Sequence, residues 1–179
     1  MVESRKLITA TLFGVVIAVL KGPFQPPYAD FLIIVEAPIL GLSFLLLGRG
    51  GATYTEIVNG LLQSGVKASF FPFSLIIAVM YGVLVDVLGT ALRVRQGDRA
   101  YSRRMVGALG IASVITGLTA AYTSIALKII PYDPTLFYVV YVPIIIWGIL
   151  SGALGGFLAA RLWEKNLKAR FRSVQPPVG

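Results

Sequence analysis

Six long apolar segments, separated by short polar connections, constrain what this chain can fold into. They cover about residues 7–20, 30–48, 53–68, 72–92, 105–128 and 137–162. A helix needs about 20 apolar residues, at 1.5 Å each, to cross the hydrocarbon core of a bilayer. In a chain of 179 residues with 56% hydrophobic and 13% charged residues, this pattern predicts an all-α integral membrane protein. We expect a bundle of six transmembrane helices over residues 1–172 and a flexible tail over 173–179.

The basic residues predict the orientation of the bundle. If both termini are cytoplasmic, all but three of the 16 lysines and arginines lie in cytoplasmic regions, the exceptions being Lys21, Lys67 and Lys128. Basic residues gather in the cytoplasmic loops of membrane proteins. The net charge of +8 therefore indicates a multi-pass protein of the cell membrane and not a nucleic-acid partner. The same distribution supports a crossing by segment 53–68, which is the least apolar of the six.

Several classes of chemistry are excluded by composition. Cysteine and histidine are absent, which removes disulfides, Cys/His metal sites, haem ligation by histidine and histidine acid–base catalysis. The sequence also lacks a Walker A motif, a catalytic triad and an HExxH motif. We therefore expect no enzymatic activity, no cofactor and no metal. Uphill transport would need energy from a partner or an ion gradient.

Polar residues inside the apolar segments are the first candidates for function, because burying them in hydrocarbon is costly. Glu36 lies in segment 30–48. Glu56, Asn59, Gln63 and Lys67 share one face of segment 53–68, which must point into the bundle or into a wet cavity. Asp86 could pair with Arg93 or Arg49. Each carboxylate could equally be a structural residue that fixes helix register, and their scatter along the sequence disfavours proton pumping.

Small residues recur every four positions in the first and last segments, as Ala10, Gly14 and Ala18 and as Gly148, Gly152 and Gly156. Such stripes let membrane helices approach closely. They serve either internal packing or the docking of another protein, and for docking we favour the first-segment stripe.

Three prolines mark helix starts or bends. We expect Pro72 in the first turn of segment 72–92. Pro38 and Pro143 fall inside their segments, where each would bend a helix.

The sequence resembles the substrate-binding S components of energy-coupling factor (ECF) transporters. The stripe Ala10-x-x-x-Gly14-x-x-x-Ala18 is similar to the Ala-x-x-x-Ala motif of that family, with glycine at the middle position. Further similar stretches are Pro38 to Ala52, Asn59-Gly60-Leu61-Leu62, Tyr81-Gly82-Val83-Leu84, and Gly148 to Ala160 followed by Trp163-Glu164-Lys165.

The resemblance implies a membrane subunit that binds a vitamin or vitamin precursor from outside. A transmembrane coupling subunit, docking on Ala10, Gly14 and Ala18, and two ATPase subunits would drive import as the S component topples in the bilayer. The nickel and cobalt subclass is excluded, because it needs an N-terminal histidine.

Aromatic residues gather at the predicted outer ends, either as an interfacial belt or around a pocket for a flat heteroaromatic ligand. The resemblance implies an outer pocket with the candidates Tyr28, Glu36, Asn59, Gln63, Tyr122, Tyr138, Tyr141 and Trp147.

Two other functions stay open on the sequence. A non-catalytic accessory subunit of a larger membrane complex, such as a respiratory complex, would explain the small stripes and scattered charges without a pocket. A stand-alone secondary transporter or channel would need no partner and would use an ion gradient.

Overall fold

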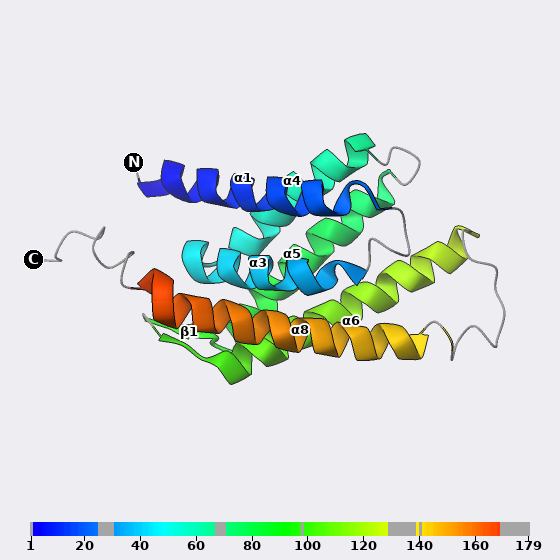
Figure 1. Cartoon of the computed structure of the whole chain (residues 1–179). Coiled ribbons are helices and arrows are strands. Elements are labelled where there is room, and N and C mark those ends of the chain that lie inside the picture. The colour runs from blue at the N-terminus through cyan, green and yellow to red at the C-terminus, as the bar shows by residue number, and fades with distance from the viewer. Residues whose placement is uncertain are drawn as a thin grey trace, which may run out of the picture.

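The computed structural model describes residues 2–24, 31–66, 71–97, 99–128, 139 and 141–168, and these residues are almost entirely helical (Figure 1). They form six α-helices: α1 (Val2–Lys21), α3 (Ile33–Leu47), α4 (Gly51–Val66), α5 (Phe73–Ala91), α6 (Ser102–Ala126) and α8 (Val142–Leu162). A π-helical turn, η3 (Trp163–Leu167), continues α8, and the short strands β1 (Arg95–Gln96) and β2 (Arg99–Ala100) pair antiparallel between α5 and α6. The predicted helical architecture is confirmed. The predicted tail, 173–179, lies outside the described residues.

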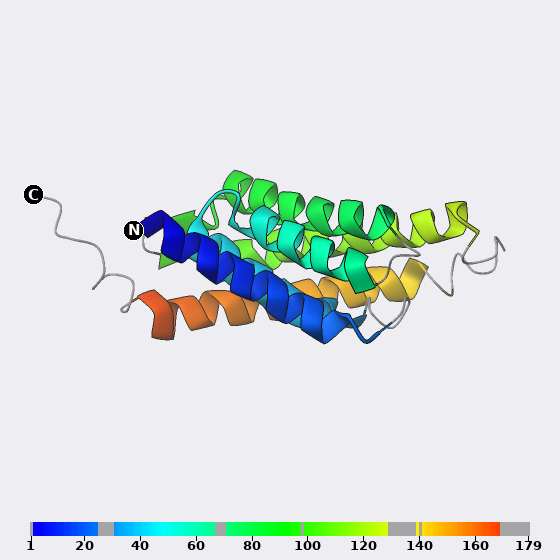
Figure 2. The ribbon, with the colours of Figure 1, turned by 90° about the horizontal axis from the view of Figure 1, so that it is seen from above.

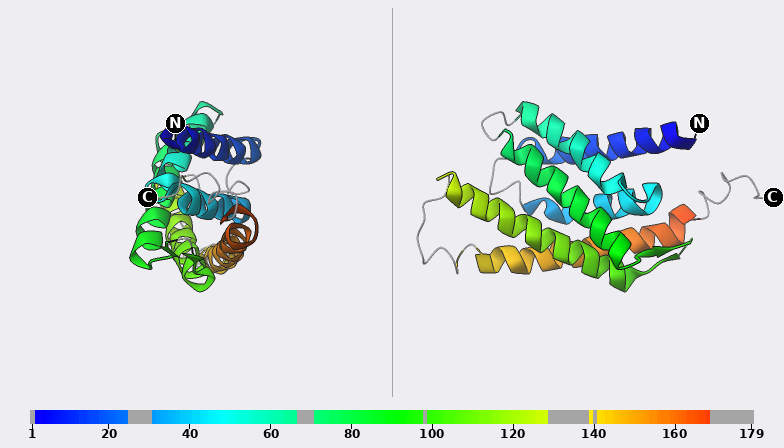
Figure 3. Two further views of the ribbon diagram at one scale, coloured as in Figure 1. Left: turned by 90° about the vertical axis from the view of Figure 1, so that its left-hand side faces the viewer. Right: turned by 180° about the vertical axis from the view of Figure 1, so that it is seen from behind.

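The helices lie along one long axis, and consecutive helices run in opposite directions (Figures 1 and 2). One end of the bundle holds the start of α1, the α3–α4 turn, the β1–β2 hairpin and the end of α8; we call it the hairpin end. Helix α3 lies centrally in the end-on view (Figure 3) and contacts each of the other five α-helices. This position explains why α3 is apolar on nearly every side, with Glu36 as its one charged residue.

The surface of the bundle is apolar, unlike that of a soluble globule, and its interior holds polar residues beside an apolar core. Exposed aliphatic side chains cover α1 and α8, for example Ile8, Leu12, Val19, Ile146 and Ile149. The buried polar residues are Glu36, Ser43, Thr55, Glu56, Asn59, Gln63, Asp86, Ser113, Thr116 and Ser151. A surface of this kind is stable in lipid and not in water, which agrees with the composition.

Among the described residues, three helices are long and apolar enough to cross a membrane: α5, α6, and α8 continued through η3. The apolar parts of α1 and α3 are shorter. Helix α3 has 15 residues, or about 22 Å at 1.5 Å per residue, against a hydrocarbon core of about 30 Å. It is shorter than the predicted 30–48, since it begins at Ile33 and ends at Leu47. The next residue, Gly48, has a φ of +80°, which suits glycine.

Two helix starts differ from the prediction. Helix α1 begins at Val2, five positions before the predicted start at 7. Helix α8 begins at Val142, so Pro143 lies in its first turn and not in its interior. The predicted bend at Pro143 is therefore wrong, because a first-turn proline removes no intrahelical hydrogen bond. Pro38 does lie inside α3.

Glycines bring α6 and α8 into close contact. A Cβ atom added at Gly148, Gly152 or Gly156 would meet the α6 backbone at Val114, Gly110 or Val106, respectively. The two sets of residues are spaced every four positions on antiparallel helices, so they face one another along the whole contact. The predicted α8 stripe therefore serves internal packing.

The β1–β2 hairpin, which the sequence did not predict, is fastened to the end of α8. Arg95 donates to the backbone oxygen of Leu45 at 2.5 Å, and its guanidinium carbon lies 5.0 Å from the centre of the Trp163 ring. The N–H of Ala100 donates to Glu164 Oε1 at 2.8 Å. These contacts join α3, the α5–α6 connection and η3 at the hairpin end.

Candidate functional site

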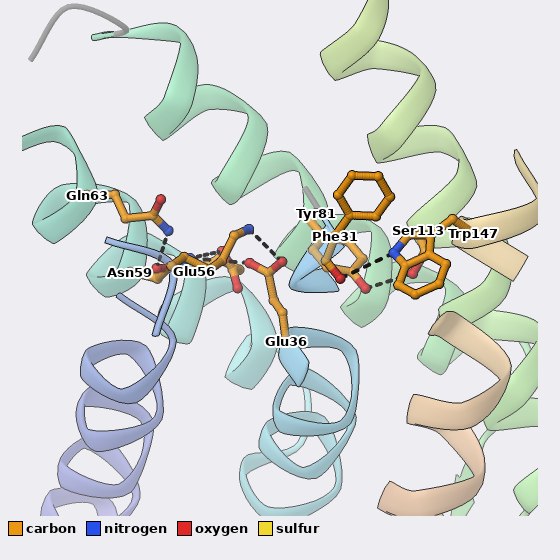
Figure 4. Close-up of polar contacts among 9 residues, drawn as sticks. Phe31, Glu36, Glu56, Asn59, Gln63, Tyr81, Ser113 and Trp147 are labelled. Carbon is orange, nitrogen blue, oxygen red and sulfur yellow. Dashed lines mark hydrogen bonds and ion pairs between the residues drawn. The ribbon is translucent and has the colours of Figure 1, made fainter. Parts of the chain in front are cut away.

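Three helices contribute to a buried polar cluster, which we call the acid–amide cluster (Figure 4). Its members are Lys21 of α1, Glu36 of α3, and Glu56, Asn59 and Gln63 of α4. Lys21 Nζ lies 2.8 Å from Glu36 Oε2 in a buried ion pair. Asn59 Nδ2 donates to Glu56 Oε2 at 2.7 Å and to Glu36 Oε1 at 3.4 Å. Gln63 Nε2 donates to Asn59 Oδ1 at 2.6 Å.

Helix α4 places its three members by simple periodicity. Residues three and four positions apart lie on one helical face, so Glu56, Asn59 and Gln63 form a polar line along α4. All three are buried, which confirms that this face points into the bundle. Glu36 lies in the first turn of α3, and Lys21 in the last turn of α1. Both of these helix ends lie opposite the hairpin end, so the cluster lies closer to that opposite end.

Glu56 Oε1 is the unsatisfied atom of the cluster. Glu56 has 0% relative exposure, and this oxygen has no hydrogen-bond partner within the described part of the chain. A buried polar atom without a partner costs free energy, and more so when it belongs to a carboxylate. The cluster also contains two carboxyl groups and one ammonium group. It therefore has unused capacity to accept a hydrogen bond, at Glu56 Oε1.

A small cavity lies beside the cluster, between α1 and α3. Its volume is about 10 Å³, and it is lined by Ile17, Leu20, Lys21, Leu32, Val35, Glu36 and Ile39. This volume is about what a single water molecule requires. A heteroaromatic ring needs a larger space, so α1 and α3 must separate before such a ligand can reach Glu36.

A second group of polar and aromatic contacts lies next to Glu36 on the side of α6 and α8 (Figure 4). The hydroxyls of Tyr81 and Ser113 are 2.8 Å apart. Trp147 Nε1 donates to the backbone oxygen of Phe31 at 3.2 Å, and the two rings meet edge to face with centroids 5.6 Å apart. Aromatic surface is therefore present beside the acid–amide cluster.

The structure brings together some of the predicted pocket residues and separates others. Glu36, Asn59 and Gln63 lie in one cluster, and Trp147 lies in the neighbouring aromatic group. Tyr122 is 68% exposed on α6, so it lines no buried pocket here. Tyr141 is half-buried just before α8, whereas Tyr28 and Tyr138 lie outside the described residues.

Sequence reasoning missed several members of the site. The sequence analysis assigned Glu56 to the polar face of segment 53–68 but did not include it among the pocket residues. It treated Lys21 only as one of the three basic residues on the outer side. Tyr81 was not expected in the site, and Phe31 was expected only as one of the aromatic residues at the outer ends. The periodicity of α4 could have included Glu56. No sequence signal pairs Lys21 with Glu36, because that contact depends on the path of the chain between α1 and α3.

The predicted docking stripe of α1 packs inside the chain. Ala10 and Ala18 are buried, and a Cβ atom at Gly14 would lie 2.7 Å from the Thr55 backbone oxygen and 2.8 Å from Val58 Cβ. In this structure α4 therefore packs on the stripe. Internal packing was one of the two roles that the sequence analysis left open for these residues.

Asp86 caps α4 and does not pair with an arginine. Its Oδ2 accepts from the backbone N–H of Thr53 at 2.8 Å and from the Thr53 hydroxyl at 2.6 Å, and its Oδ1 accepts from the N–H of Ala52 at 3.3 Å. No arginine lies within ion-pair distance of Asp86 among the described residues. The first N–H groups of a helix lack intrahelical partners and attract negative charge. The hydrogen-bond donors for the Asp86 carboxylate therefore come from the start of α4 and not from an arginine.

Comparison of the chain with family models, with curated proteins and with solved structures gives no match.

Proposed function

We propose that this chain is the membrane-embedded substrate-binding component of an ECF-type, ATP-driven importer. Its substrate is a vitamin or vitamin precursor with a flat heteroaromatic ring. The six helices cross the membrane with both termini in the cytoplasm, and the substrate enters from the end opposite the hairpin. A transmembrane coupling subunit and two ATPase subunits supply the energy.

The observation that carries this proposal is the acid–amide cluster. Three helices bury two carboxyl groups and two amide groups near one end of the bundle, and one oxygen, Glu56 Oε1, has no hydrogen-bond partner in the described part of the chain. Binding sites combine apolar walls with a few converging polar groups. The Phe31 and Trp147 rings beside the cluster offer surface for a flat ligand.

The charge distribution supports the proposed orientation. Arg49, Arg93, Arg95, Arg99, Arg103, Arg104, Arg161, Lys165 and Lys168 all belong to the hairpin end, in its turns or at its helix ends. In the described residues, the opposite end carries Lys21 and Lys128. The positive-inside rule then places the hairpin end in the cytoplasm and the acid–amide cluster toward the outside.

Docking of the coupling subunit on Ala10, Gly14 and Ala18 requires a movement of α1. Helix α4 covers this stripe in the structure, so α1 must leave α4 before a partner can bind there. Entry of a ligand also requires α1 to move, because the cavity between α1 and α3 is too small for a heteroaromatic ring. One displacement of α1 would meet both requirements.

Reconstitution tests the proposal. The chain is placed in liposomes alone, or together with a coupling subunit and two ATPases, and uptake of a panel of radiolabelled vitamins and heteroaromatic precursors is measured. We expect uptake that needs both the partners and ATP, and ATPase variants that cannot hydrolyse ATP serve as the control. Gradient-driven uptake by the chain alone would instead identify a secondary transporter. Co-purification with redox subunits and no binding across the panel would identify an accessory subunit.

A further inference from the structure

We propose that the acid–amide cluster selects a ligand with a cationic N–H donor, such as an amidinium or amino-heterocyclic group, and that the Lys21 ammonium holds this position in the ligand-free protein. This inference rests on the proposed function and narrows its substrate class. It follows from three features of the cluster: its charge, its unsatisfied acceptor and the position of Lys21.

The two carboxyl groups of the cluster favour a cationic donor. Glu36 and Glu56 both lie within hydrogen-bond distance of Asn59 Nδ2, so their carboxyl groups share one small volume. Lys21 is the one cation paired with them among the described residues. A ligand with a carboxylate or phosphate group would bring its negative charge and its acceptor oxygens against the oxygens of two carboxyl groups.

The geometry of the cluster favours a donor. Asn59 donates to both carboxyl groups, and Gln63 donates to Asn59 Oδ1, which fixes the amide with its NH₂ group toward the carboxyl oxygens. Glu56 Oε1 is left as a buried acceptor. A planar amidinium presents two parallel N–H groups and suits carboxyl oxygens well, as the guanidinium of arginine does.

Lys21 shows that the site accepts an ammonium group. Its Nζ lies 2.8 Å from Glu36 Oε2, with 15% of the lysine side chain and 4% of the glutamate side chain exposed. Lysine carries its charge on a flexible stem of four carbons, and Lys21 lies in the last turn of α1. Its ammonium can therefore withdraw toward the membrane surface when a ligand cation takes its place. Lys21 also lines the cavity beside Glu36, so its withdrawal widens that space.

Three aromatic probes of matched size test the selectivity. Benzamidine is a planar cation with N–H donors, benzamide is neutral, and benzoate is an anion. Binding of each probe to the detergent-purified full chain is measured by isothermal titration, and thermal unfolding of each unliganded variant is recorded. We expect wild-type protein to bind benzamidine more tightly than benzamide and to show no binding of benzoate.

Two variants with opposite expected effects keep the test independent of misfolding. Glu56→Gln removes one carboxylate, and we expect about a tenfold loss of benzamidine affinity, as for a lost hydrogen bond to a charged group. Lys21→Met removes the competing ammonium, and we expect about a tenfold gain in benzamidine affinity on the same basis. A misfolded variant cannot produce that gain.

Matched controls remove the same charges away from the cluster. Glu164→Gln changes an exposed glutamate at the hairpin end, and Lys128→Met changes an exposed lysine at the opposite end. Both should leave benzamidine affinity unchanged. Equal binding of benzoate and benzamidine would overturn the inference, as would unchanged benzamidine affinity in both Glu56→Gln and Lys21→Met.

The outcome separates this inference from the proposed function. The fragment titrations need no partner subunits, so selective, Glu56-dependent benzamidine binding without ATP-driven uptake would keep the cation site and reject the importer. ATP-driven uptake of an anionic vitamin that is unaffected by Glu56→Gln would keep the importer and reject the cation site.

Discussion

Glu36 and Glu56 accept hydrogen bonds from the same amide nitrogen, Asn59 Nδ2, at 3.4 Å and 2.7 Å. The two glutamates belong to different helices, α3 and α4, and their carboxyl groups would repel one another without a donor between them. Asn59 therefore links the two helices as well as the two acids. Two carboxyl groups that lie far apart in the sequence are thus close together in the folded chain.

Replacing Asn59 should destabilise the protein. Asn59→Leu keeps the branched shape of the side chain but removes both hydrogen bonds to the glutamates, so we expect the free energy of unfolding to fall by about 2–3 kcal/mol. Denaturation in mixed micelles measures the change, and Asn166→Leu, at an exposed position of η3, is the control. In a Glu56→Gln background the cost should be smaller, because one of the acids is gone. Equal costs in both backgrounds would contradict the link between Asn59 and Glu56.

Single cysteines should report that α4 crosses the membrane. The chain has no native cysteine, so Arg49→Cys and Val66→Cys each introduce a unique thiol, at exposed positions before and at the end of α4. In intact cells, we expect a membrane-impermeant maleimide to label Val66→Cys and to label Arg49→Cys only after lysis. The cysteine-free parent protein controls for background. Labelling of both positions from one side would show that α4 does not cross.

Two glycines at one interface should respond differently to alanine. A Cβ atom at Gly152 would overlap the α6 backbone at Gly110, whereas a Cβ atom at Gly110 meets nothing within 4 Å. Gly152→Ala should therefore push α6 and α8 apart and lower the melting temperature. Gly110→Ala should leave it unchanged or raise the stability by about 0.5–1 kcal/mol, because alanine favours the helix. Equal effects would mean that the two helices do not meet as described.

Gly14→Ala should distinguish internal packing from partner docking. The added Cβ atom would meet the Thr55 backbone oxygen at 2.7 Å, so we expect the isolated chain to unfold at a lower temperature. Leu12→Ala, on the exposed face of α1, should have little effect. If Gly14→Ala leaves the isolated chain intact but prevents co-purification of a coupling subunit, the stripe serves docking and not packing.

Removing the cap of α4 should cost stability without affecting ligand binding. Asp86→Ala loses the acceptor of two backbone N–H groups and of the Thr53 hydroxyl, and we expect a loss of about 1–2 kcal/mol in the free energy of unfolding. Thr53→Val loses one of these bonds and should cost less. Benzamidine affinity should stay at the wild-type value in both variants, because the cap lies outside the acid–amide cluster.

Local pattern was enough to predict the helices, and it failed where contacts depend on the path of the chain. Spacing along one helix revealed the polar face of Glu56, Asn59 and Gln63 and the close-packing glycines of α8. The Lys21–Glu36 pair, by contrast, joins residues on either side of a connection whose course no periodicity encodes.

Two further differences have local physical causes. Asp86 was expected to meet an arginine, but the unsatisfied N–H groups at the start of α4 lie closer. The β1–β2 hairpin has strands of two residues each, too short for an alternating pattern. It is held by contacts of Arg95 and Ala100 with Leu45, Trp163 and Glu164, which lie outside the hairpin.

The fastening of the hairpin to α8 does not involve α1. Contacts of Arg95 and Glu164 hold α3, the β1–β2 hairpin and η3 together at the hairpin end, whereas α1 packs against α3 and α4. The displacement of α1 that the proposed function requires would therefore break none of the contacts that fasten the hairpin.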